Sequence, residues 1–467
     1  MDLAAPVKEA ASRQSGLGEW FGHPRGLTYI VLTEMWERFS FYGMQALLML
    51  YMTGQLLHAE VVETVWGMAG LRGAVEAVVG RLSQEAFAAQ IFGLYVALVY
   101  LGPIVGGWLG DRLLGRTAAV LTGAGLLALG HFAMVFEPAF LIALACIIAG
   151  AGLLKGNLAA QVGMLYPQGD PRHDAGYTLY VTSVVIGAFL APLICGTLGE
   201  VYGWHYGFAA AGFGMLIGIT VYLSGLRALR PAEPQIAASE KMRLQPGDGA
   251  KIAALCGLIL VTSLFWTVQT QIWNIYPIWL RDHVSLAIGG GLHVPVTWFQ
   301  SLDALSVLLL TPVSIRLWKK ARRRGREPDD IVKIAFGCAL FGLACVLLAI
   351  GQWQARDGRV AILWPTVFHF VVGAGYLLSA PIALAVIARH APAAVRSMMV
   401  GGYYIGLFLA GFISGWLGRF YEPLHPPAFW LLHCAIGLSG MGLLLMARRP
   451  LKAVLGMNDR GSDVNRH

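Results

Sequence analysis

Three ionisable residues lie within one helical turn near the N-terminus, inside a stretch that is otherwise apolar enough to cross a lipid bilayer. Glu34, Glu37 and Arg38 occur in the run Glu34-Met-Trp-Glu-Arg-Phe-Ser-Phe-Tyr-Gly43. Their i,i+3 and i,i+4 spacings place both carboxylates and the guanidinium on one helix face. Because two acids share one arginine, at least one carboxylate is expected to carry a proton. Such charges typically belong to an ion or proton path; the alternative is an ion-pair cluster that only orients its helix.

A lysine occurs in a similar setting further along the chain. Lys155 belongs to the apolar run Gly150-Ala-Gly-Leu-Leu-Lys-Gly-Asn157. An ammonium group at membrane depth needs a carboxylate, a carbonyl dipole or water as its partner. Two interpretations are open: Lys155 serves a functional site, or it caps the end of a helix.

The composition indicates which kind of chain must position these charges. Of the 467 residues, 57% are hydrophobic and only 13% are charged, proportions that a soluble domain does not have. Apolar segments of spanning length, about 20 residues, recur along the whole sequence. We expect an all-α polytopic membrane protein with twelve transmembrane helices, near 28–56, 87–109, 115–137, 139–166, 177–199, 205–226, 251–280, 297–318, 331–353, 360–388, 398–421 and 427–447.

Lysine and arginine residues predict the orientation of these spans. They concentrate near 227–251, near 316–326 and after residue 447, and short loops rich in these residues stay in the cytoplasm. Both termini are therefore expected in the cytoplasm, with the protein in a plasma membrane, most simply a bacterial inner membrane. The net charge of +8 follows from this topology and indicates no nucleic-acid binding. The six cysteines show no metal-site spacing, so no metal centre is predicted.

The polar segment 227–250 divides the spans into two groups of six. We predict a cytoplasmic N-terminal segment at 1–27, an N-terminal six-helix bundle at 28–226, a cytoplasmic linker at 227–250, a C-terminal six-helix bundle at 251–447 and a cytoplasmic tail at 448–467. Within the first bundle, an amphipathic stretch at 61–82 is expected on the periplasmic surface. Transporters built from two such halves bind their substrate near the bilayer midplane, between the halves.

A charged motif follows the second predicted span. The run Gly106-Gly-Trp-Leu-Gly-Asp111-Arg112-Leu-Leu-Gly115-Arg116 resembles the cytoplasmic motif of the major facilitator superfamily. The resemblance implies that Asp111, Arg112 and Arg116 hold the inward gate of a transporter.

Motifs along nearly the whole chain are similar to those of the proton-dependent oligopeptide transporter family, also called the peptide transporter family. The sequences that carry this resemblance are Glu34-x-x-Glu37-Arg38-Phe39, the run around Lys155, Asp174-Ala-Gly, Phe265-Trp266 with Gln271, Pro295-x-x-Trp298-Phe-Gln300-Ser301, Ser379 with Pro381, and Ala391-Pro392. The resemblance implies a major facilitator fold and proton coupling through Glu34, Glu37, Arg38 and Lys155. It also implies that Lys155 lies near the carboxylate end of the substrate.

Several positions depart from the family pattern. Gln45 stands where an arginine usually faces the peptide carboxylate, Thr270 where helix seven usually has an acid, and Tyr376 where an acid usually receives the peptide amino group. One change has the opposite sign, because Asp303 stands where a neutral amide is common. We hypothesise that Asp303 takes over cation binding or proton exchange from the missing helix-seven acid; alternatively, it is a helix-start or interface residue.

Polar and aromatic residues in the spans are candidates for the wall of a peptide-sized cavity. Each of them singly also fits a packing or interface role. The predicted substrate-binding residues are Tyr42, Gln45, Tyr95, Lys155, Asn157, Tyr180, Gln269, Thr270, Trp273, Asn274, Asp303, Tyr376, Ser379, Tyr403 and Tyr404.

The leading hypothesis is a proton-coupled symporter that imports di-/tripeptides or peptide-like solutes by alternating access. The alternative, favoured by the loss of the amine-binding acid, is a proton-coupled transporter of a non-peptide organic anion or modified amino acid. The proton is the coupling ion, and no other cofactor is expected. Partners are the small-molecule substrate and the lipid bilayer, and function as a monomer is expected. An enzyme is disfavoured because no HExxH, Gly-x-Ser-x-Gly or paired Cys/His set occurs.

Overall fold

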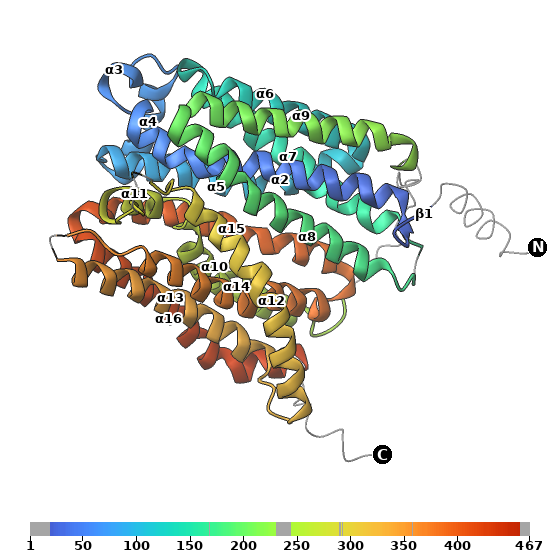
Figure 1. The fold of residues 1–467 in the computed structure, drawn as a ribbon. Helices are drawn as coiled ribbons and strands as arrows, with labels where there is room; N and C mark the ends of the chain where they lie inside the picture. The colour runs from blue at the N-terminus through green and yellow to red at the C-terminus, as the bar shows by residue number, and fades with distance from the viewer. Residues whose placement is uncertain are drawn as a thin grey trace, which may run out of the picture. The chain divides into compact units, whose positions relative to one another are not determined.

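The computed structural model describes residues 19–167, 169–229, 244–288, 291, 293–356 and 358–457, and Figure 1 labels its elements. The start of the predicted N-terminal segment, most of the predicted linker and the end of the predicted tail lie outside the described residues. The described chain is almost entirely helical. Its first element is a hairpin of two short antiparallel strands, β1 (Glu19–Trp20) and β2 (His23–Pro24).

Twelve helices of the described chain contain 18 residues or more. At about 1.5 Å per residue, a helix of roughly 20 residues crosses the hydrocarbon core of a bilayer. The first six are α2 (Arg25–Tyr51), α5 (Gln84–Leu109), α6 (Arg116–Ala133), α7 (Phe140–Met164), α8 (His173–Ala191) and α9 (Trp204–Leu229). The other six are α10 (Asp248–Thr270), α12 (Trp298–Arg323), α13 (Asp330–Ala355), α14 (Leu363–His390), α15 (Arg396–Leu417) and α16 (Tyr421–Leu455).

Nine stretches of the described residues are long and apolar enough to cross a membrane by length and composition. One of them, Ala393–Leu455, contains both α15 and α16. The helix α2 is not among the nine, and it holds Glu34, Glu37 and Arg38 in its interior. The apolar character of α2 is therefore lowered at the position where the sequence predicts a functional site.

Short helical turns extend or connect the long helices. Four π-helical turns follow α2, α5 and α8: η1 (Met52–Leu56), η2 (Gly110–Leu114), η4 (Pro192–Gly196) and η5 (Leu198–Tyr202). Three 3₁₀ turns are η3 (Glu137–Ala139), η7 (Ala393–Val395) and η8 (Gly418–Phe420). The stretch expected to be one amphipathic segment at 61–82 contains two helices, α3 (Ala59–Val62) and α4 (Met68–Val79). They are separated at Gly67, whose φ of +81° suits glycine and ends a helix.

The predicted span 251–280 is divided into α10 and a second helix, α11 (Ile275–His283). Pro277 explains the break, because proline has no N–H to donate to the Trp273 carbonyl and its ring clashes with that carbonyl. The backbone turns at Asn274, where φ is −100° and ψ is −97°. The Gln271 side chain compensates in part, since its Oε1 accepts from the Ile275 N–H at 3.4 Å.

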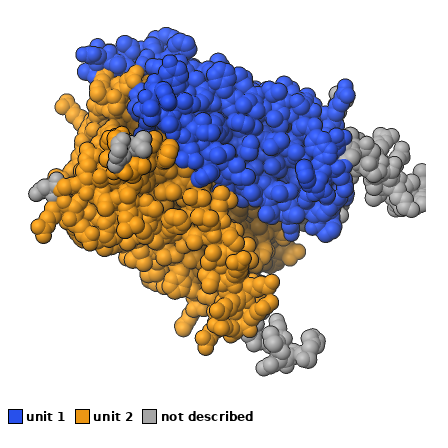
Figure 2. Space-filling model, viewed as in Figure 1, with its two compact units in different colours: residues 1–47, 59–68, 101–239 blue, residues 48–58, 69–100, 240–467 orange. Residues whose placement is uncertain are grey.

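The helices form two compact units, coloured separately in Figure 2. Unit 1 contains residues 1–47, 59–68 and 101–239, and unit 2 contains 48–58, 69–100 and 240–467. The predicted bundles are contiguous in sequence, whereas these units are not. The first part of α5, up to Tyr100, groups with unit 2, and the rest of α5 groups with unit 1.

Glycine contacts bring helix backbones together inside each unit. In unit 1, a Cβ on Gly123 of α6 would lie 2.7 Å from the Gly150 carbonyl of α7, and a Cβ on Gly150 would lie equally close to the Gly123 carbonyl. In unit 2, a Cβ on Gly93 of α5 would lie 2.5 Å from the Gly415 Cα of α15. Small residues permit such close approach between membrane helices. Within unit 2, α13 and α16 also run side by side (Figure 1).

Candidate functional site

The acidic pair of α2 shares its arginine unequally. Arg38 Nε donates a hydrogen bond to Glu34 Oε1 at 2.7 Å, and the same nitrogen lies 3.1 Å from Glu37 Oε2. Both carboxylates are completely buried. Neither Glu37 oxygen accepts a hydrogen bond within the described part of the chain. Glu37 is therefore the carboxylate that is held less firmly, and the better placed of the two to exchange a proton.

Lys155 of α7 completes this cluster in unit 1. Its Nζ lies 3.6 Å from the ring centroid of Phe41, and both side chains are buried. Lys155 also interacts electrostatically with Glu37 and, less strongly, with Glu34. The ammonium is therefore placed between an aromatic face and an acidic pair. Sequence reasoning missed Phe41, although its i,i+4 spacing from Glu37 could have indicated it.

Helix α8 closes the cluster on another side. A Cβ on Gly187 would lie 2.5 Å from the Met35 carbonyl and 2.7 Å from Arg38 Cβ, so only glycine fits there without displacement. Tyr180 of α8 and Tyr42 of α2 interact electrostatically with Arg38. These two predicted residues therefore belong to the surroundings of the cluster.

Two other predicted residues of unit 1 lie on the same helices. Gln45 is buried on α2, two turns beyond Arg38. Asn157 is buried on α7, and its Nδ2 donates to the Gly106 carbonyl at 3.0 Å and to the Leu153 carbonyl at 2.8 Å. Both donors of the Asn157 amide are thus used to hold α7 against α5.

The predicted gate residues form an exposed ion pair. Arg116 Nη2 lies 3.0 Å from Asp111 Oδ1, which connects the start of α6 to η2. Arg112 is exposed. Gly115 makes the turn between them, with a φ of +75° that residues with a Cβ rarely adopt.

In unit 2, Asp303 of α12 is joined to Gln269 of α10. Gln269 Nε2 donates to Asp303 Oδ2 at 2.9 Å. Gln269 is buried, whereas Asp303 is partly exposed. The neighbouring Thr270 donates its hydroxyl to the Trp266 carbonyl at 2.7 Å, so it does not replace the missing acid chemically.

Aromatic side chains gather one turn from Gln269. Trp266 Nε1 donates to the Tyr403 hydroxyl at 3.1 Å, and the Trp266 ring meets the Tyr376 ring edge to face, with centroids 6.1 Å apart. Tyr404 stacks on Tyr100, with centroids 6.3 Å apart. The predicted residues of α10, α12, α14 and α15 therefore include one polar pair and an aromatic wall.

The remaining predicted residues of unit 2 have local partners. Ser379 donates to the Gly375 carbonyl at 2.7 Å, and Asn274 Nδ2 lies 3.3 Å from Ser414 Oγ at the α10–α11 break. Trp273 is buried in the same break, and Tyr95 is buried on α5 beside Phe92. These four residues are placed in packing contacts.

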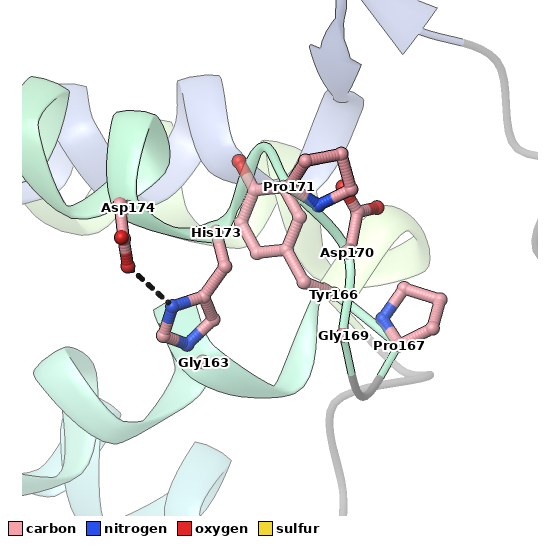
Figure 3. Close-up of a pocket in the computed structure, with 8 residues that line it drawn as sticks. All are labelled: Gly163, Tyr166, Pro167, Gly169, Asp170, Pro171, His173 and Asp174. Carbon is pink, nitrogen blue, oxygen red and sulfur yellow. Dashed lines mark hydrogen bonds and ion pairs between the residues drawn. The ribbon is translucent and has the colours of Figure 1, made fainter. Parts of the chain in front are cut away.

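A cavity of about 360 Å³ lies elsewhere in unit 1, in the loop between α7 and α8 (Figure 3). Tyr166, Asp170 and His173 line it. Burial raises the pKa of Tyr166 to about 12, and hydrogen bonds from Arg172 lower the pKa of Asp170 to about 2. None of the predicted site residues lines this cavity, so it is separate from the cluster around Glu37.

Comparison with known proteins supports the resemblance seen in the sequence. The family model described as POT family matches residues 117–245 and 235–423. The chain is 30% identical to an uncharacterized transporter of Bacillus subtilis (strain 168), YclF, over 93% of this chain and 96% of that protein. It is 29% identical to a di-/tripeptide transporter of Lactococcus lactis subsp. cremoris, over 94% of this chain and 97% of that protein.

The fold matches solved structures as well. A crystal structure of a peptide transporter POT in complex with sulfate superimposes with a TM-score of 0.82 and 28% identity, covering 96% of this chain and 99% of that chain. The fold and the buried charged cluster together define a multi-pass membrane transporter with the major facilitator fold, and not an enzyme. The chain belongs to the POT family. The family and fold class predicted from the motifs are thereby confirmed.

Proposed function

We propose that this protein is a proton-coupled symporter that imports di-/tripeptides or peptide-like solutes across the inner membrane by alternating access. The similarity to a di-/tripeptide transporter along nearly the whole chain supports the cargo. The observation that carries the proton coupling is the buried set of Glu34, Glu37, Arg38 and Lys155 in unit 1.

The arrangement suggests how a proton is taken up and passed on. Glu37 lies within reach of two cations but accepts no hydrogen bond from the described residues. Protonation of Glu37 removes one charge from that balance and leaves Lys155 over the Phe41 ring without its nearest counter-ion. Lys155 is then available to the carboxylate end of a substrate. Proton binding and substrate binding would be linked through this one ammonium group.

A second candidate cargo keeps the same coupling. Gln45, Thr270 and Tyr376 stand where the family usually has charged residues, which favours a non-peptide organic anion or a modified amino acid. Both proposals place the protein as a monomer in the lipid bilayer, with both termini in the cytoplasm and the proton as the only coupling ion.

Uptake of labelled di-alanine and tri-alanine into proteoliposomes tests the proposal. We expect accumulation with an inward proton gradient, and its loss in Glu37→Gln. Exchange of labelled for unlabelled peptide, which needs no gradient, should persist in Glu37→Gln and would show that the variant is folded. Glu60→Gln is the matched control, because Glu60 is an exposed glutamate of α3. No peptide uptake by folded wild type would exclude the peptide cargo; gradient-driven accumulation by Glu37→Gln would exclude Glu37 as the proton carrier.

A further inference from the structure

The Gln269 side chain presents an unsatisfied acceptor in unit 2. Gln269 is only 8% exposed, and its Oε1 accepts no hydrogen bond from the described part of the chain. Its Nε2 is committed to Asp303 Oδ2, which fixes the orientation of the amide and leaves the oxygen free for a donor. A buried acceptor without a donor is unfavourable. This position therefore favours a ligand that brings N–H groups.

The charge next to this acceptor is uncompensated. No lysine or arginine of the described chain pairs with Asp303, whose only hydrogen-bonding side-chain partner there is Gln269. Arg38, by contrast, balances the acids of unit 1 within the protein. Gln269 also lies at the C-terminal end of α10, where the helix dipole adds partial negative charge. Asp303 remains partly exposed, so a solute can reach it.

The surrounding side chains suit a cation rather than an anion. Trp266 and Tyr376 present aromatic rings near the pair, and ring faces attract cations. The Tyr403 hydroxyl is occupied, because it accepts from Trp266 Nε1 and donates to the Ala380 carbonyl at 3.4 Å. Asp303 interacts electrostatically with the Tyr376 hydroxyl. An anion at this position would meet the carboxylate directly.

We propose that Asp303 and Gln269 bind a primary ammonium group, the α-amino end of the transported substrate. An ammonium group has three N–H donors, so it can satisfy Gln269 Oε1 and the Asp303 carboxylate together. The inference rests on the proposed transport function and deepens it. It selects cation binding over proton exchange for Asp303, and it moves amine recognition to α12 from the helix in which Tyr376 stands.

Competition with blocked and free peptides tests the site. In wild-type proteoliposomes, Ala-Ala should inhibit uptake of labelled di-alanine at a concentration at least about tenfold lower than N-acetyl-Ala-Ala, since a charge-assisted hydrogen bond is lost on acetylation. In Asp303→Asn and Gln269→Leu the preference for the free amine should shrink, to about one in Asp303→Asn. Gradient-driven accumulation at saturating peptide should remain in Asp303→Asn. Ser306→Ala, one turn further on α12, is the matched control, because the Ser306 hydroxyl contacts only the Asp303 backbone carbonyl, at 2.7 Å.

The outcomes separate this site from the proposed function. An Asp303→Asn protein that still prefers the free amine overturns the ammonium site and leaves symport intact. Loss of gradient-driven accumulation with an unchanged preference also overturns it, and assigns Asp303 to proton exchange. If wild type transports no peptide, the proposed function fails, and alanine amide is compared with N-acetylalanine amide by thermal stabilisation of the purified protein. Stabilisation of wild type but not Asp303→Asn by alanine amide alone would support the site, and equal effects would overturn it.

Discussion

Glu34, Glu37 and Arg38 could be predicted from sequence because their contacts are local. All three lie on α2 at helical spacing, so periodicity alone brings them together. The partners supplied by other helices could not be predicted in this way. That Lys155 lies over Phe41, and that Gln269 bonds Asp303, depends on how separate helices pack, and no spacing in the sequence encodes it.

The Phe41 ring is expected to matter for transport through Lys155. Phe41→Leu removes the aromatic face and keeps an apolar side chain, and a desolvated cation–π contact contributes about 1–2 kcal/mol. We expect the initial rate of gradient-driven peptide uptake to fall roughly five- to thirtyfold. Phe41→Tyr keeps the ring and should transport at close to the wild-type rate. A Phe41→Leu protein as active as wild type would contradict this role.

Helix positions follow from hydrophobic length, but helix interruptions follow from particular residues. The break between α10 and α11 was missed, because an apolar run gives no sign of where a proline acts. Pro277 supplies the reason once the two helices are seen. The kink of α16 has a similar origin, since His425 has a φ of +58° directly before Pro426 and Pro427.

The contact between α5 and α15 should tolerate no added methyl group. Gly93→Ala would place its Cβ against the Gly415 backbone, and overpacking of this kind costs about 1–3 kcal/mol. We expect a lower melting temperature in detergent and reduced uptake. Gly107→Ala is the control on the same helix, because a Cβ there would meet nothing within 4 Å. Equal stability of the two variants would show that the contact is not a constraint.

The turn between α12 and α13 should give a pH-dependent contribution to stability. Hydrogen bonds from Arg322 and Lys333 lower the pKa of Glu327 to about 2, against roughly 4.3 for an unfolded glutamate. A lowered acid pKa stabilises the fold above the unfolded value, and the contribution disappears as the pH falls towards 2. Glu327→Gln should therefore melt below wild type at pH 7, with a gap that narrows at pH 3. Glu63→Gln, an exposed control, should show no gap, and a pH-independent gap for Glu327→Gln would refute the pairing.

At the scale of the molecule, the sequence predicts the number and character of the spans well because bilayer thickness fixes helix length. It does not predict the two compact units, since the division of α5 at residue 100 depends on which helices its two ends contact. Orientation comes from the charged loops and can be tested directly.

Labelling of single cysteines should report the orientation. In a variant whose six cysteines are replaced, Glu60→Cys should react with a membrane-impermeant maleimide on intact cells. Arg326→Cys should react only after permeabilisation, because it follows α12 in a segment rich in arginine. Both positions are exposed, so access to solvent is matched. The reverse pattern would invert the proposed topology.

The buried cluster of unit 1 also determines how this carrier responds to voltage. With all four groups ionised, the charges of Glu34, Glu37, Arg38 and Lys155 sum to zero. One added proton makes the sum +1. A membrane potential then acts on the proton-loaded form of this cluster and not on its empty form, at about 2.3 kcal/mol per charge for 100 mV. The cell interior, being electrically negative, would pull the loaded cluster inward and leave its empty return unopposed.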